Sequence, residues 1–217
     1  MATGCSTLQA GDGIGPARQV LTIEAPDTSW RQTMPVLSAD ALTLREVRQE
    51  DAASLLAMLA TDDVSRFMSP LPPTLDSFGR FVAWNNEQRA SGQSVCFVVI
   101  PEGIGNPVGV FQMRSLEPAF VTAEWGFALG SPFWGTGLFA SAAQLVLDFA
   151  FGTLGVRRLE ARACAENRRG NGALRKLGAT PEGVLRRSFL WHGQYHDQVL
   201  WSILDCDWTG AAPGRSR

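Results

Sequence analysis

Residues 122–139 read TAEWGFALGSPFWGTGLF, a strand-like run followed by a glycine turn. In the run, Glu124, Gly126 and Ala128 alternate with large apolar residues, so a strand would place the two sets on opposite faces. The apolar set is Trp125, Phe127 and Leu129. After Gly135 and Gly137, apolar residues recur at helical spacing, as Leu138, Ala142, Leu145 and Phe149.

A strand that passes through a glycine turn into a helix directs unpaired backbone N–H groups, and the positive end of the helix, at one point. Such a point suits a pyrophosphate, and the two glycines let the phosphates approach the backbone without a Cβ in the way. Glycines also occur at such turns for packing alone. This feature by itself therefore leaves both a phosphate site and a purely structural turn open.

The segments on either side of this stretch predict a mixed sheet. Upstream, short strands are expected near residues 42–44, 95–100 and 108–116, with amphipathic helices around Leu55 and from a Thr74 cap through Phe78 and Asn85. Downstream, the pattern predicts a strand over 156–164, a helix that stops at Gly178, and two strands over 184–191 and 195–204. We expect an α/β (α+β) fold with a mostly antiparallel sheet of about seven strands and helices on both faces.

Composition limits the kinds of partner. The 217 residues carry a net charge of −2, so no overall positive field favours nucleic acid, although arginine-rich segments in the second half leave an anionic ligand open. The cysteines, Cys5, Cys96, Cys164 and Cys206, form no CxxC pair, and Gly193 separates His192 from His196, so no metal site is expected. The chain shows no bilayer-spanning run and no secretory signal, which favours the cytoplasm.

The chain divides into three predicted parts. Residues 1–38 are rich in Gly, Ser, Thr, Pro and Ala and are expected to form an extension outside the core. Residues 39–208 carry the regular patterns of one domain, and residues 209–217 form a short tail.

Several motifs taken together resemble the GNAT superfamily of N-acetyltransferases, and most closely the branch that acetylates the N-termini of ribosomal proteins. They include Trp134-Gly135-Thr136-Gly137, Arg158-Leu159-Glu160-Ala161-Arg162, Glu166-Asn167, Arg175-Lys176-Leu177-Gly178 and His192-Gly193-Gln194-Tyr195-His196-Asp197. The resemblance covers Leu44 to Leu204 and implies that the fourth and fifth predicted strands, which end near Leu129 and Cys164, splay apart. It also implies acetyl-CoA as co-substrate, an amine as acceptor, and a homodimer by analogy.

The resemblance assigns the cofactor-binding residues. The backbone of Phe127, Ala128 and Leu129 would bind the pantetheine arm, and the turn would bind the pyrophosphate through Trp134, Gly135, Thr136, Gly137, Leu138 and Phe139. The side chain of Asn167 would also contact the cofactor, the alternative being a turn residue after a strand. A nucleotide-binding loop is disfavoured, because Leu138-Phe139 replaces the Lys-Ser/Thr ending of a P-loop.

The implied reaction is direct attack of a neutral amine on the thioester, with Glu124 as candidate general base; the alternative for Glu124 is a surface or ion-paired carboxylate. Three positions depart from the family: Gly170 replaces a serine proposed as the acid, Phe139 fills a usually small position, and Ser141 replaces a glutamate. Tyr195 is the candidate substitute acid, and the alternative for it is packing beside the sheet.

The acceptor and the activity itself are open at this stage. We expect α-amines or weakly basic small molecules as acceptors, because their amines are partly neutral at working pH. Four tryptophans are candidates for an apolar acceptor pocket, with core packing as the alternative: Trp30, Trp84, Trp125 and Trp191. The competing class of function is an acyl-CoA-binding or sensing module of the same fold that lacks activity.

Overall fold

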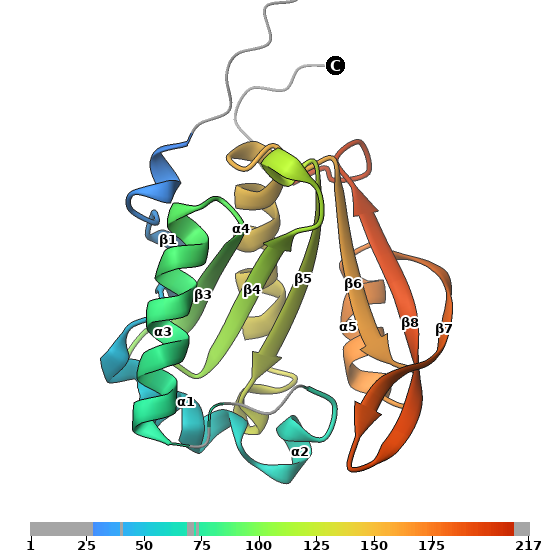
Figure 1. Ribbon diagram of the computed structural model, residues 1–217, viewed down its shortest axis with the longest axis horizontal. Helices are drawn as coiled ribbons and strands as arrows, with labels where there is room; N and C mark the ends of the chain where they lie inside the picture. The colour runs from blue at the N-terminus through green and yellow to red at the C-terminus, as the bar shows by residue number, and fades with distance from the viewer. Residues whose placement is uncertain (1–27, 40, 69–71, 73, 211–217) are drawn as a thin grey trace, which may run out of the picture.

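One sheet of eight strands organises the protein (Figure 1). The computed structural model describes residues 28–39, 41–68, 72 and 74–210. The strand order is β1-β2-β3-β4-β5-β6-β8-β7, and every neighbouring pair is antiparallel except β5 and β6. The strands are β1 (Leu37–Ala39), β2 (Leu42–Glu46), β3 (Ser94–Pro101), β4 (Gly109–Ser115), β5 (Thr122–Leu129), β6 (Arg158–Cys164), β7 (Thr180–Trp191) and β8 (Gln194–Leu204). The predicted mixed, mostly antiparallel sheet is confirmed, with the short β1 as an addition.

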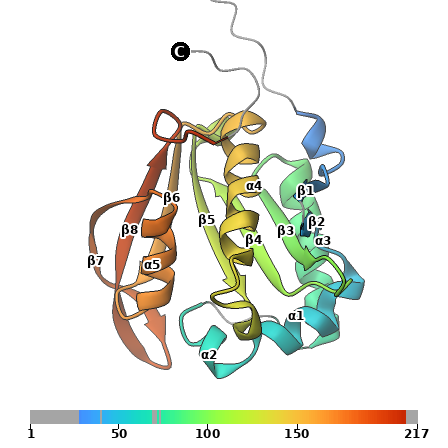
Figure 2. The ribbon, with the colours of Figure 1, turned by 180° about the vertical axis from the view of Figure 1, so that it is seen from behind.

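Helices cover both faces of the sheet, as predicted. On one face lie α1 (Ala52–Leu59), α2 (Asp62–Ser65) and α3 (Leu75–Ala90). Figure 2 shows α4 (Leu138–Gly152) and α5 (Arg168–Lys176) on the other face. Four short 3-10 turns join these elements: η1 (Ser29–Arg31), η2 (Gln49–Asp51), η3 (Pro118–Phe120) and η4 (Ser131–Phe133).

Two apolar cores lie on the two faces of the sheet. The larger core packs α4 against residues such as Phe97, Phe111 and Trp125, and the smaller packs α1 and α3 around Phe78 and Val98. The predicted alternation in β5 is confirmed, because Trp125 and Leu129 belong to the larger core and Ala128 to the smaller one.

Local signals set several element ends. The predicted cap of α3 is confirmed: Thr74 Oγ1 accepts a hydrogen bond from the Ser77 amide, and Ser77 in turn bonds back to Thr74. After α5, Gly178 has a φ of +86°, a left-handed conformation that glycine adopts without a Cβ penalty. The β7–β8 hairpin turns at His192 and Gly193, also as predicted.

The folded region reaches further toward the N-terminus than residue 39. Trp30 and Met34 are 4% and 5% exposed and belong to the larger core, where the Trp30 ring meets Phe120 edge-on. The predicted boundary at residue 38 is therefore too late. Two isolated apolar side chains in a segment rich in small and polar residues show no periodic pattern, so the sequence did not indicate that they are buried. The rest of the predicted extension, residues 1–27, and tail residues 211–217 lie outside the described residues.

Candidate active site

The parallel pair β5–β6 is joined only at its start. Paired residues run from Thr122 with Arg158 to Glu124 with Glu160, whereas β5 continues to Leu129 and β6 to Cys164. Beyond Glu124 the two strands diverge, as Figure 1 shows, while each stays paired with its other neighbour. The predicted splay is confirmed, and Glu124 lies at its vertex.

Backbone alternation in β5 shows which groups face this split. Gly130 donates its N–H to Val108 on the β4 side, whereas the carbonyl of Val121 accepts from Arg157 on the β6 side. Even-numbered residues of β5 therefore direct their backbone groups to β4, and odd-numbered residues direct theirs toward β6. The N–H and C=O of Phe127 consequently face the split, while the backbone groups of Ala128 are directed to β4.

The glycine turn after β5 is exposed and rich in free amides. Gly135 and Gly137 have φ values of +78° and +90°, and a Cβ on either would meet no atom within 4 Å. Within the described part of the chain, five backbone N–H groups here have no hydrogen-bond partner: those of Gly135, Thr136, Gly137, Phe139 and Ala140. They lie at the N-terminus of the 15-residue helix α4, where the helix dipole favours an anion.

Other residues of the predicted loop hold the turn in shape. Thr136 Oγ1 donates to the Phe133 carbonyl and accepts from the Leu138 amide at 3.3 Å, so Leu138 has no free N–H for a ligand. Trp134 donates its indole N–H to the Leu129 carbonyl at 2.8 Å. Phe139 packs on Phe127 with ring centroids 4.6 Å apart, so the unusual side chain at this position stabilises β5 from the core side.

A cavity of about 460 Å³ passes through the split between the two strands. On the α4–α5 side its walls include Phe127, Ala161 and Leu174, which belong to or pack against the larger core. On the other side its lining residues include Phe67, Met68, Phe81, Gln112, Arg162 and Gln198. The would-be Cβ of Gly126 meets nothing within 4 Å, so this glycine leaves the passage open. The cavity therefore joins the two faces of the sheet.

Asn167 lines the cavity at the start of α5, where its side chain also caps the helix. Its Oδ1 accepts a hydrogen bond from the Gly170 amide at 2.8 Å. A Cβ on Gly170 would lie 2.6 Å from Asn167 Nδ2. The Asn167 side chain can therefore take this position only because residue 170 is a glycine and not the serine of the family. Beneath them, buried Asn171 bonds to the carbonyls of Cys164 and Asn167 and to the indole of Trp201, fixing α5 on the sheet.

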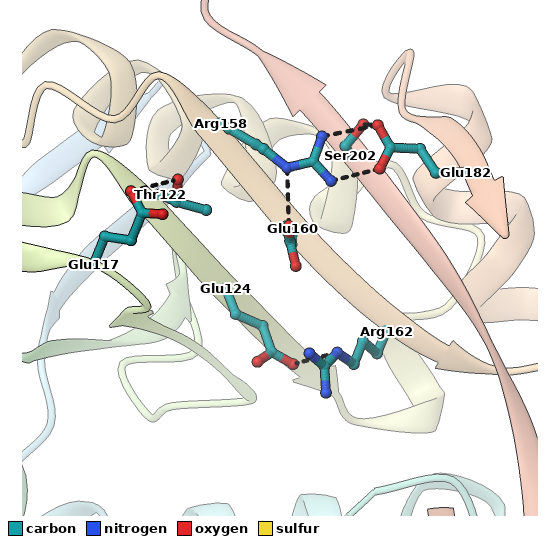
Figure 3. A network of polar contacts seen from close by, with 8 residues as sticks. All are labelled: Glu117, Thr122, Glu124, Arg158, Glu160, Arg162, Glu182 and Ser202. Atoms are coloured by element: carbon teal, nitrogen blue, oxygen red, sulfur yellow. Dashed lines mark hydrogen bonds and ion pairs between the residues drawn. The ribbon is translucent and has the colours of Figure 1, made fainter. Parts of the chain in front are cut away.

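Glu124 is held between two arginines at the vertex of the split. Its Oε2 accepts hydrogen bonds from Arg114. Its Oε1 lies 3.7 Å from Arg162 Nε, an ion pair that Figure 3 shows. The ion-paired alternative is therefore found for both oxygens, although only Oε2 is hydrogen-bonded. Because 3.7 Å exceeds hydrogen-bond distance, Oε1 keeps its lone pairs available.

A second ion-pair group lies on the same face of the sheet (Figure 3). Arg158 bonds to Glu160 through Nε and to Glu182 through Nη1, each at 2.8 Å, and Ser202 also donates to Glu182. Hydrogen bonds from Arg158 and then from Ser202 lower the pKa of Glu182 to about 2. The pKa of Arg158 is correspondingly raised, chiefly by its hydrogen bond to Glu182. This group joins β6, β7 and β8.

Tyr195 does not lie at the cavity. It is 56% exposed on the β7–β8 hairpin, and the guanidinium of Arg187 lies 5.3 Å from its ring centroid. The hairpin carries Tyr195 outward, and its phenol does not line the cavity. Of the four candidate tryptophans, only Trp125 lines the cavity, while Trp30 is in the core.

Neither histidine lines the cavity, although the ring of His196 lies 6.5 Å from that of Phe189, which does. His192 stacks edge-on against Trp191 at the hairpin turn, and His196 Nδ1 lies 3.4 Å from Glu166 Oε1. Among the described residues, one group has metal-ligating atoms within 4.8 Å of one another: Cys164, Glu166 and His196. None of the three lines the cavity.

Comparison with known proteins identifies the fold family. A family model of the acetyltransferase (GNAT) domain matches residues 41–180. The chain belongs to the GNAT acetyltransferase family. It is therefore an acyltransferase that uses acetyl-CoA as acetyl donor, and the predicted resemblance is confirmed.

Relatives of this GNAT protein include members of the predicted branch. It is 29% identical to the uncharacterized N-acetyltransferase p20 of Bacillus licheniformis, over 82% of this chain and 100% of that one. It is 26% identical to the [ribosomal protein uS5]-alanine N-acetyltransferase of Escherichia coli, over 86% and 98% of the two chains. In fold it is similar to Mycobacterium smegmatis RimJ in complex with CoA-disulfide, with a TM-score of 0.69 and 23% identity over 78% of this chain and 86% of that one.

The GNAT site fits a CoA thioester. An elongated arm needs partners along its amides, and the split offers the unpaired backbone of Phe127. A pyrophosphate needs several N–H donors, and the turn offers five. Within the residues that the structure describes, no helix is long and apolar enough to span a membrane.

The GNAT site also contains residues that sequence reasoning missed. Ala140 adds a free amide to the turn, and Arg162, Gln112 and Gln198 line the cavity. One signal was present: the polar alternation of Arg158, Glu160 and Arg162 in an interior strand indicates a part of one sheet face that no helix covers.

Proposed function

We propose that this protein transfers the acetyl group of acetyl-CoA to the amine of a peptide N-terminus or small molecule, by direct attack within a ternary complex. The observation that carries the proposal is the cavity of about 460 Å³ that passes through the split sheet. It connects the side where the exposed glycine turn lies to the opposite face of the sheet. A donor entering from one side and an acceptor from the other would meet without a covalent enzyme intermediate.

The donor would be held by main-chain groups. The free amides of Gly135, Thr136, Gly137, Phe139 and Ala140 are the proposed pyrophosphate ligands, and the backbone of Phe127 is the proposed partner of the pantetheine arm. The Leu129 carbonyl is already bound by Trp134, so Leu129 would contribute its N–H alone. An N–H at this end of β5 would also stabilise negative charge on the thioester oxygen.

Glu124 is the proposed general base. It is the last residue of β5 paired with β6, and its Oε1 has no hydrogen-bond partner within the described residues. The amine nitrogen attacks the carbonyl carbon, the carbon–sulfur bond breaks, and the amine proton passes to Oε1 directly or through water. With Gly170 in place of a serine, the departing thiolate would take its proton from solvent, which its ordinary pKa of about 8.5 permits.

One experiment separates an enzyme from an acyl-CoA-binding module. Calorimetry measures CoA binding, and release of free thiol from acetyl-CoA measures turnover across a panel of amines. The proposal predicts both binding and amine-dependent thiol release. Binding without release by any amine would favour the module, and the absence of both would contradict the assignment of the cavity.

A further inference from the structure

Three arginines, Arg114 on β4 and Arg158 and Arg162 on β6, lie near the point where β5 and β6 separate, on the side of the sheet opposite α4 and α5. They differ in their hydrogen-bond partners. Arg158 is bonded to both Glu160 and Glu182, and Arg114 is bonded to Glu124 through Nε and Nη2. Arg162 has only the contact of 3.7 Å between its Nε and Glu124 Oε1, and no hydrogen bond in the part of the chain that the structure describes. Arg162 is also the only one of the three that lines the cavity.

This guanidinium therefore shares the carboxylate of Glu124 with Arg114 and has no hydrogen-bonded acceptor among the described residues. Its side chain is 38% exposed and lines the cavity, and only its Nε lies near a carboxylate, so the donors at its Nη atoms are free for a ligand. A guanidinium with free N–H groups at the wall of a substrate cavity suits an oxyanion, above all a carboxylate, which it binds through two parallel hydrogen bonds.

Glu124 places an opposite charge directly beside it. The two side chains come from neighbouring strands, at the point where those strands separate, with Oε1 and Nε 3.7 Å apart. A carboxylate and a guanidinium side by side complement a molecule whose amine and carboxylate are also side by side. The amine would lie at Glu124 and the carboxylate at Arg162 (Figure 3).

The rest of this side of the cavity is largely apolar. Phe67, Met68, Phe81 and Phe189 line it, together with Pro72 and Val110. These side chains offer a surface for an apolar group but no further charge. A polyamine, by contrast, would bring several positive charges to a wall that contains Arg162 and, behind Glu124, Arg114.

We infer that the acceptor is an α-amino acid, or a similar small amine with a carboxylate beside the amine, that carries an apolar side chain, and that Arg162 binds this carboxylate. The inference rests on the proposed function and deepens it. Arg162 is a specificity-determining residue in this account, and Glu124 receives the proton of the same molecule.

The test compares matched acceptors in matched variants. Steady-state kcat/KM is measured for L-phenylalanine and L-leucine and for their amides, with spermidine as a polycationic acceptor. The enzymes are the wild type, Arg162→Gln and Arg114→Gln; the last removes the other arginine at Glu124, which does not line the cavity. An amino acid and its amide differ in the basicity of the amine, but this difference is the same in all three proteins. The decisive quantity is therefore the ratio of kcat/KM for the amino acid to kcat/KM for its amide, compared between the proteins.

We expect the wild type to acetylate the amino acids, and Arg162→Gln to lower kcat/KM for them by about 10-fold or more through loss of a charge-assisted hydrogen bond, while the amides change far less. Arg114→Gln should leave the acid-to-amide ratio as in the wild type, whatever its effect on overall rate. An equal loss for acids and amides in Arg162→Gln would overturn the inference, as would a wild type that uses amides or spermidine but not amino acids. Absence of turnover with every amine would instead count against the proposed function.

Discussion

The sharpest prediction concerns Gly137, the N-cap residue directly before α4, which has a φ of +90°. In Gly137→Ala the new Cβ would meet no protein atom within 4 Å, so the only cost in the free protein is the left-handed conformation. That conformation costs an L-residue about 1–2 kcal/mol. For a domain of this size the melting temperature should fall by about 2–8 °C.

The effect on CoA binding should be separate and larger. The same Cβ projects where the pyrophosphate would approach the free amides, so at least one charge-assisted hydrogen bond would be lost. Such a bond contributes about 1.5–3 kcal/mol, so Kd for CoA should rise about 10-fold or more.

Gly155→Ala is the matched control. Gly155 has a φ of +74°, its Cβ would also meet no atom within 4 Å, and it follows the opposite end of α4. Both variants should lose similar stability in thermal melts, and only Gly137→Ala should lose CoA affinity by calorimetry. Unchanged affinity in Gly137→Ala, or equal weakening in both variants, would refute the assignment of the turn.

Three further predictions test other parts of the structure. Glu124→Gln should lower turnover about 10-fold or more with Kd for CoA unchanged, and an unaltered rate in the thiol-release assay would remove Glu124 from the reaction. Asn171→Ala would leave the buried Trp201 indole N–H without its acceptor and remove the side-chain bonds to the Cys164 and Asn167 carbonyls, which keep backbone donors, so urea unfolding should show a loss of about 1–3 kcal/mol of unfolding free energy; no measurable loss would contradict this role. The pKa of Glu182 falls from 4.5 to about 2 on folding, so its ionised form stabilises the folded state. After solvent screening this contribution to the free energy of unfolding is about 1 kcal/mol. It is complete above pH 4.5 and is lost as the pH falls toward 2. The stability difference between wild type and Glu182→Gln should shrink across that window, and parallel curves would argue against the ion pair.

Strands and helices with strong periodicity were predictable, and exceptions have local causes. The strand β1 has three residues, too few for alternation to show. The strand β7 begins at Thr180, not at 184, and its first residues include Pro181 and Gly183, which disfavour strands. Because β7 is an edge strand with a bulge between these residues, the ladder does not require the N–H that proline lacks.

The site was predictable where the chain is continuous and less so where distant segments meet. The turn after β5 follows from one stretch of sequence, whereas the split beside it was implied by the resemblance to the GNAT family. The capping of the Leu138 amide by Thr136 depends on a side-chain rotamer that a pattern does not specify. The role of Arg162 depends on which part of the sheet the helices leave uncovered, and the outward position of Tyr195 depends on the path of the hairpin.

The most direct test of the central claim is a crystal structure of the protein with CoA. The account predicts the pyrophosphate at the amides of residues 135–140 and the sulfur inside the split, between the β5 residues after Glu124 and the β6 residues after Glu160. CoA bound elsewhere, with the split filled by side chains and the turn free of phosphate, would contradict it.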